Sequence, residues 1–143
     1  MGSSVFDFSD DEILGSLKLY QRSLVAELLV ANDEETAARI WLSSTGPLDL
    51  RKFGGVPDSG EDAFYQRFRA EFRAYVCGDE RYKEERDDLL KIAKPAASYV
   101  IAAISAAVAS TLGIAVGLVV PAVALLLKVV GKLGLNAWCA VGS

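Results

Sequence analysis

Residues 96–127 read AASYVIAAISAAVASTLGIAVGLVVPAVALLL, a run of 32 residues without a charged side chain. The chain has 143 residues, and all its acidic and basic residues lie at or before Lys94 except Lys128 and Lys132. Such a run is placed in lipid or inside protein, because its exposure to water is unfavourable. We therefore expect a helical head domain at 1–94, and a hydrophobic C-terminal segment with a short tail at 95–143.

The length of the run decides how it can cross a membrane. A spanning helix needs about 20 apolar residues, and residues 108–127 supply them. At about 1.5 Å per residue the whole run would be about 48 Å long, too long for one upright span. The segment is therefore expected to tilt, kink or fold back. Pro121 predicts a kink, and Gly113 with Gly117 a looser point.

The residue types in the run predict close helix packing. Ten of the 32 residues are alanine and 14 are valine, isoleucine or leucine, so the first half is a weak membrane segment by itself. Gly113 and Gly117 form a small-xxx-small pattern, which lets two helices approach closely. Trp138 is of a type that favours a membrane interface. The candidate membrane or helix-packing residues are Gly113, Gly117, Pro121, Leu125 and Trp138.

A buried position is the alternative to a membrane span. Residues 96–112 and 118–132 could form an antiparallel hairpin inside a sheath of other helices, because a helix that is apolar all round is also typical of a protein core. The preceding head offers few helices to cover such a hairpin. This alternative therefore predicts a soluble protein-interaction subunit whose hairpin is buried in a homo-oligomer or a partner complex.

The head shows helical periodicity and no alternating strand pattern. Ser9 with Glu12 predicts a capping box at the start of the first helix, and Asn32 with Glu35 repeats the pattern. Glycine and proline residues predict a loop at 47–60. The expected helices cover about 9–31, 32–46, 61–77 and 79–94. The predicted fold class is all-α: a small bundle of about four amphipathic helices followed by a long Ala/Gly-rich hydrophobic helix or helical hairpin.

Composition excludes several functions. The net charge of −4 argues against nucleic-acid binding, and the absence of histidine removes the usual general base and a common metal ligand. Cys77 and Cys139 are far apart in the sequence. They indicate neither a disulfide framework nor a CxxC site and fit a reducing cytosol. Basic residues before the apolar run place the head in the cytoplasm of a tail-anchored protein, with a wholly cytoplasmic protein as the alternative.

Possible docking residues lie in the head. Phe53 and Val56 occupy the glycine-rich loop, which lacks phosphate-binding spacing. Arg67, Arg69 and Arg73 alternate with aromatic residues of the third expected helix, where a packed aromatic stripe with a solvated basic face is the simpler interpretation. An acidic partner or an anionic lipid headgroup is the alternative for these arginines.

No residue pattern predicts catalysis. The paired carboxylates stand at expected helix starts, where capping explains them, so we expect no catalytic, metal-binding or cofactor-binding residues, no small-molecule substrate and no enzyme. The sequence predicts instead a small membrane-associated protein whose head binds a protein partner or signal. Its hydrophobic segment would act on membrane lipid, as in a toxin-like or stress-response effector.

Overall fold

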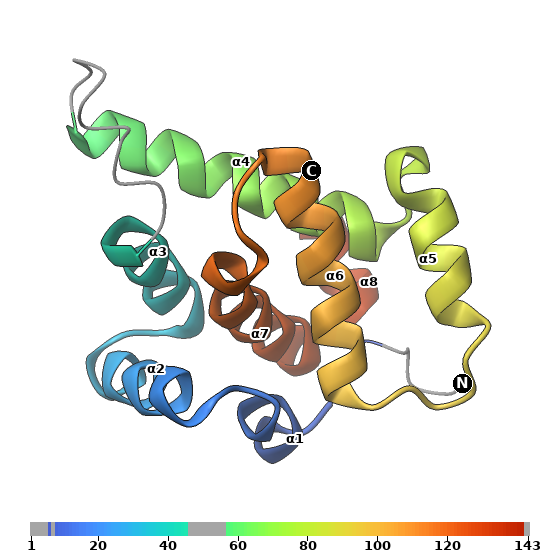
Figure 1. Cartoon of the computed structure of the whole chain (residues 1–143), viewed down its shortest axis with the longest axis horizontal. Coiled ribbons are helices and arrows are strands. Elements are labelled where there is room, and N and C mark those ends of the chain that lie inside the picture. The colour runs from blue at the N-terminus through green and yellow to red at the C-terminus, as the bar shows by residue number, and fades with distance from the viewer. Residues whose placement is uncertain (1–5, 7, 46–56, 142–143) are drawn as a thin grey trace.

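The fold is all-α, as the sequence predicts. The computed structural model describes residues 6, 8–45 and 57–141, and none of these residues lies in a β-strand (Figure 1). The elements are α1 (Asp10–Gly15), α2 (Leu19–Ala31), α3 (Glu34–Thr45), α4 (Pro57–Cys77), the 3-10 helix η2 (Glu80–Tyr82), α5 (Lys83–Leu90), α6 (Ala97–Leu112), α7 (Val116–Leu133) and α8 (Leu135–Val141).

The apolar helix α7 lies at the centre of the bundle. Figure 1 shows α7 between α3 and α6, with α4 running across one end of both and α1 and α2 at the other. Every residue of α7 from Pro121 to Lys128 is buried. One continuous core reaches from Phe6 to Trp138, so residues of the head and of the hydrophobic segment pack together. The predicted boundary at residue 94 is a change of composition within this shared core.

The first predicted helix is broken into two. The Ser9–Glu12 capping box is present, but α1 ends at Gly15 and α2 begins at Leu19. The break shifts the helical phase. As a result Tyr20 and Leu24, which follow the buried Leu17 at helical spacing, are 60% and 42% exposed. The prediction of one continuous amphipathic helix is therefore wrong.

A side chain stabilises the break. The guanidinium of Arg22 donates hydrogen bonds to the carbonyl of Leu14 at 3.1 Å and to that of Leu17 at 3.3 Å. These carbonyls lie where the helix is interrupted, and that of Leu14 also accepts the Leu17 N–H at 3.2 Å. Arg22 thus lets the chain turn at a point where periodicity alone favours a straight helix.

The other helix boundaries differ slightly from those predicted. The carboxylate of Asp33 accepts the Thr36 N–H at 2.8 Å and caps α3, whereas Asn32 donates to the Leu28 carbonyl at 2.9 Å and closes α2. Helix α4 begins at Pro57, inside the predicted loop, and proline suits the first turn of a helix. Helix α5 ends at Leu90, before the predicted end at Lys94.

Candidate functional site: an apolar hairpin closed by ion pairs and a disulfide

The hydrophobic segment is a helical hairpin. The turn between α6 and α7 contains only residues 113–115. Gly113 has a φ of 75°, a left-handed conformation that suits glycine, and its N–H donates to the Ala109 carbonyl at 2.8 Å. These features end α6 and let α7 fold back beside it. The hairpin is therefore the form that the predicted helix or hairpin takes in this structure.

The small-xxx-small pattern does not form a packing face here. Gly113 ends α6, and Gly117 belongs to the first turn of α7, so the two residues do not share one helix. A Cβ atom added to either glycine would meet no atom within 4 Å. In this fold neither glycine brings two helices into close contact, and Gly113 serves the turn instead.

Pro121 lies within α7 and is buried. Proline has no N–H, so the carbonyl four residues earlier in the helix receives no backbone hydrogen bond from it. Next to that position, the indole N–H of the buried Trp41 in α3 donates to the Leu118 carbonyl at 2.9 Å. The proline-containing end of α7 is thus attached to α3 through a side chain.

Helix α7 is the feature closest to a membrane segment. It has 18 residues and, among the helices that the structure describes, it is long and apolar enough to cross a membrane. Leu125, a predicted packing residue, is fully buried at its centre. Just over half of the helix, 56%, is buried inside the protein. The core helix of a soluble protein has the same properties, so the finding alone gives only a weak indication of membrane association.

Two lysines attach the C-terminal half of α7 to the head. The ammonium of Lys128 lies 3.0 Å from a carboxylate oxygen of Asp10 in α1, and that of Lys132 lies 2.6 Å from Glu34 in α3. The Lys128 side chain is only 6% exposed. These are the two basic residues that follow the uncharged run, and they stand one helical turn apart on the same helix. Their spacing is the sequence signal that could have predicted a shared polar face.

The tail is attached to α4. Cys77, the last residue of α4, forms a disulfide with Cys139 in α8. The interpretation of these cysteines as unpaired is therefore wrong, because the fold brings together two residues that are 62 positions apart. The bridge also removes the support that the cysteines gave to a reducing cytosol.

Trp138 is buried beside the disulfide rather than placed at a surface. Its ring meets Phe72 of α4 edge to face at a centroid distance of 5.5 Å, and the Arg69 guanidinium lies 5.3 Å from its centroid. An interfacial tryptophan would expose its ring, so this position differs from the prediction. In the folded protein Trp138 is an anchor that holds α8 against α4.

The predicted docking arginines have separate surroundings. Arg67 is exposed, Arg69 pairs with Glu35 of α3 at 3.1 Å, and Arg73 donates to the Cys139 carbonyl. Phe53 and Val56, the other predicted docking residues, lie outside the described residues. Because two of the arginines serve contacts within the fold, the three do not form one basic docking face.

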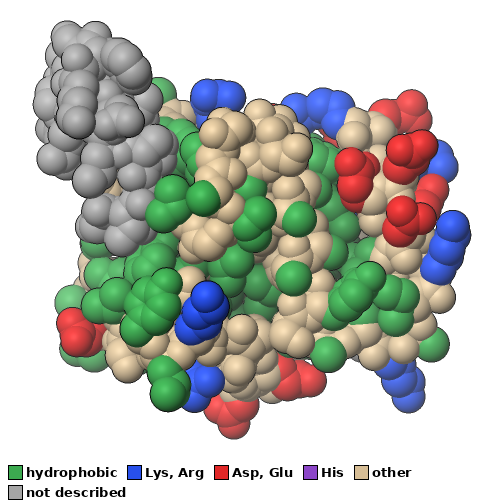
Figure 2. All heavy atoms as spheres, viewed as in Figure 1, with side chains coloured by type: hydrophobic (Ala, Val, Ile, Leu, Met, Phe, Trp, Pro, Cys, Tyr) green, Lys and Arg blue, Asp and Glu red, His purple; other side chains and the backbone are tan. Residues whose placement is uncertain are grey.

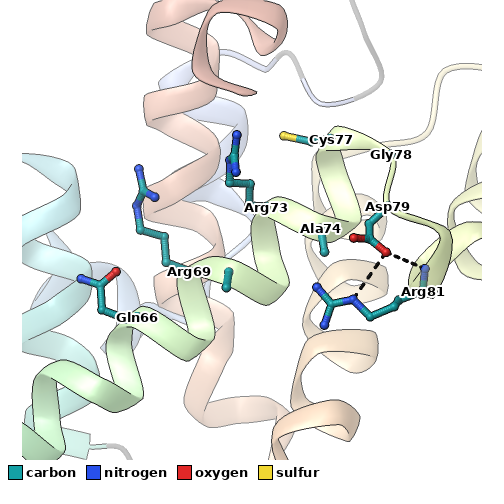
Figure 3. A pocket seen from close by; sticks show the side chains of 9 residues that line it. Gln66, Arg69, Arg73, Ala74, Cys77, Gly78, Asp79 and Arg81 are labelled. Carbon is teal, nitrogen blue, oxygen red and sulfur yellow. Dashed lines mark hydrogen bonds and ion pairs between the residues drawn. The ribbon is translucent and has the colours of Figure 1, made fainter. Parts of the chain in front are cut away.

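A hollow of about 570 Å³ lies beside the disulfide (Figure 3). Arg69 and Arg73 extend from one part of its rim, while Arg81 turns toward Asp79 at 3.4 Å and Glu71 at 2.9 Å. The Arg81 backbone N–H, which Asp79 accepts, holds the pKa of the Asp79 carboxyl below its usual range. Nearby carboxylates thus offset the positive charges, and the arginines do not converge on a common anion.

The described residues contain no cluster of three or more side chains suited to a metal ion. No protein-family model, curated protein or solved structure matches this chain. The hairpin, its ion pairs and its disulfide are therefore the features of this chain that bear on function.

Proposed function

We propose that this protein stores a membrane-inserting hairpin inside a water-soluble helical bundle and inserts it into a bilayer when the head meets a partner or signal. The proposal retains the non-enzymatic, effector-like function expected from the sequence. One observation carries it: a helix with the length and composition of a membrane span is held at the centre of the bundle by a small number of polar contacts.

The energetics support such an exchange. Lipid tails are about as apolar as a leucine-rich core, so transfer of α7 from protein to lipid gives up little hydrophobic free energy. The polar contacts to be broken are the Lys128 and Lys132 ion pairs and the Trp41 hydrogen bond. The apolar surface of the head that α7 covers must also be covered again, by lipid or by the partner that acts as the trigger. Both lysines lie near the C-terminal end of α7, where their long side chains can reach the headgroup region. A membrane surface can therefore replace what the head supplies.

The outer face of α6 also suits lipid. Its exposed positions carry small or uncharged side chains, so the helix can enter a bilayer without burying a charge. These positions are Ser98, Tyr99, Ala102, Ala106, Ser110 and Thr111. Membrane lipid is the first proposed partner, and a protein or a second copy of the chain is the proposed trigger at the head.

The test is dye release from liposomes of defined zwitterionic and anionic composition. We expect purified protein to release an encapsulated dye and to remain in the membrane pellet after an alkaline wash. A matched variant, Leu125→Lys with Leu126→Lys, places two charges at the centre of α7 and should abolish release. Because these substitutions also disturb folding, Ala106→Lys, at an exposed position near the middle of α6, provides a comparison variant that should fold. An absence of release by the native protein at all lipid compositions would exclude this function.

A second candidate function rests on the exposed face of α2. Leu19, Tyr20, Leu24 and Val30 are 73%, 60%, 42% and 88% exposed, and Figure 2 shows hydrophobic side chains gathered over α2 and α3. Exposed apolar groups of this kind favour a soluble interaction subunit. This alternative predicts extraction without detergent and an oligomer on size exclusion with light scattering, with no dye release. Leu24→Glu would then shift the protein to monomer.

A further inference from the structure

The disulfide limits where the two ends of the hairpin can go. Cys77 and Cys139 have Cα atoms 5.8 Å apart, and Cys139 belongs to α8, directly after α7. As long as the bridge is intact, α8 stays within a few ångströms of the end of α4. Any membrane-inserted form of the bridged protein must keep these two helices on the same side of the bilayer.

A hairpin can enter a bilayer in two ways. In turn-first insertion, residues 113–115 cross to the far side, and both α4 and α8 stay on the near side. In tail-first insertion, α7 alone spans and α8 crosses, as in a tail-anchored protein. Helix α8 would then lie on the far side, about 27 Å (the length of the 18 residues of α7) from the near side, where α4 remains. The bridge forbids this separation of α8 from α4, because α4 carries several arginines that do not enter lipid easily and so cannot follow α8.

We propose that the Cys77–Cys139 disulfide selects turn-first insertion and that its reduction opens the tail-first, tail-anchored route. The inference rests on the proposed function and adds its regulation by redox state. A dithiol reductant supplies two electrons and two protons: the S–S bond breaks, two cysteine thiols form, and the dithiol becomes a disulfide. Cys77 is exposed, so a reductant can reach the bridge.

The residues on each route fit this selection. The turn lies within the uncharged run at 96–127, so it crosses without carrying a charge into lipid. Turn-first insertion also keeps Lys128 and Lys132 on the near side. Tail-first insertion carries Lys128 and Lys132 toward the far side with the end of α7, whereas α8, with the sequence LNAWCAV, adds no further charge to the segment that crosses once the bridge is opened. The chain can therefore follow either route, and the bridge decides between them.

The lengths of the helices agree with a short hairpin. The 16 residues of α6 and 18 of α7 give about 24 Å and about 27 Å, against about 30 Å of hydrocarbon. A segment slightly shorter than the bilayer is accommodated by local thinning. Thinning around an inserted hairpin is also a physical route to the leakage that the dye assay measures.

Two matched charge substitutions distinguish the routes. Ala115→Lys places a charge in the turn, and Ala140→Lys places one in α8; both alanines are exposed in the folded protein, so both variants should fold. In bridged protein we expect Ala115→Lys to lower the rate of dye release by about tenfold or more, while Ala140→Lys leaves it nearly unchanged. After reduction with dithiothreitol, Ala140→Lys should become the more sensitive variant.

Cys77→Ser with Cys139→Ser gives the same comparison without reductant. In that background, a lower rate of dye release caused by Ala140→Lys supports selection of the insertion route by the bridge. The midpoints of thermal unfolding check that each variant is folded. The inference would be overturned if Ala115→Lys and Ala140→Lys lowered dye release equally in protein shown to be bridged on a non-reducing gel. It would also be overturned if the effects of the two substitutions were the same before and after reduction. If neither redox state of the native chain releases dye, the proposed function fails, and this inference fails with it.

Discussion

Lys128 places an ammonium group within the most apolar helix of the protein. Its side chain is 6% exposed, and its partner Asp10 is 62% exposed, so one member of the pair is buried and the other is at the surface. A buried charge without a partner is costly, whereas replacement of a buried pair by apolar groups is often neutral. Asp10 therefore stabilises the fold mainly by satisfying Lys128.

The first prediction separates these effects. Asp10→Ala should lower the free energy of unfolding by about 1–3 kcal/mol, because it leaves the Lys128 ammonium without its carboxylate. Lys128→Met should change it by less than about 1.5 kcal/mol, since methionine fills a similar volume without a charge. Urea denaturation measures both.

Asp11→Ala is the matched control for this prediction. Asp11 also stands in the acidic first turn of α1, so its removal alters the helix-end electrostatics but not the Lys128 pair. A larger loss for Lys128→Met than for Asp10→Ala would contradict the interpretation of Asp10 as the group that compensates a buried charge.

At the scale of elements, α3 is attached to both ends of α7. Trp41 donates to the Leu118 carbonyl near the start of α7, and Glu34 pairs with Lys132 near its end. Trp41→Phe should lower the free energy of unfolding by about 1 kcal/mol, because it removes the hydrogen bond and retains most of the ring. Relative to the native chain, amide hydrogen exchange in the Trp41→Phe variant should become faster in the first turns of α7 than in its last turn. Uniform exchange along the helix would argue against a local attachment at Trp41.

The cap of α3 should make stability depend on pH. Thr36 donates from its side chain and its backbone to Asp33, and these hydrogen bonds hold the pKa of the Asp33 carboxyl below its usual value. A lowered pKa means that the folded state favours the ionised carboxylate. The resulting stability is present above the ordinary pKa of 3.8 and is lost as the pH falls through the lower, folded-state pKa.

Asp33→Asn tests this dependence. Asparagine caps helices about as well as aspartate but does not titrate. Between about pH 6 and about pH 3 the midpoint of thermal unfolding should therefore fall less in the variant than in the native chain. The expected difference would be absent if protonated Asp33 capped α3 as well as the carboxylate does. The two proteins would then show parallel profiles of thermal midpoint against pH.

At the scale of the whole molecule, the disulfide closes a loop that contains α5, α6 and α7. A bridge between residues 62 positions apart is expected to stabilise the folded state by about 4 kcal/mol in the chain-entropy description. Cys77→Ser should thus lower the free energy of unfolding by up to about 4 kcal/mol under oxidising conditions. Under strong reduction the native chain and the variant should unfold at nearly the same urea concentration, and a persistent large difference would point to a packing role of the sulfur instead.

The sequence predicts helix type and apolar organisation well, since these depend on local signals. The Ser9 capping box follows from a short pattern that the structure confirms. Folding back at Gly113 is one of the three arrangements that the length of the apolar run leaves open. The break after α1 is not predicted by the sequence, because the helical periodicity favours one continuous apolar stripe. Arg22 supplies hydrogen bonds that stabilise the turn. Three-dimensional packing decides such a break.

The contacts that close the hairpin are harder to predict. Each depends on two residues distant in the sequence: Lys128 with Asp10, Lys132 with Glu34, and the two cysteines. No spacing rule connects such pairs. The sequence likewise underestimates how well the head buries α7, because α3 covers more of α7 than the short apolar stripe of α3 suggests.

The position of Cys139 after α7 also sets an order of events during synthesis. Cys77 leaves the ribosome well before the apolar helix, and its partner follows only after that helix is complete. A translating chain with an exposed α7 cannot yet be bridged, so the disulfide forms only on a molecule whose longest apolar helix has already been made. An intact bond therefore identifies chains in which the synthesis of α7 is complete.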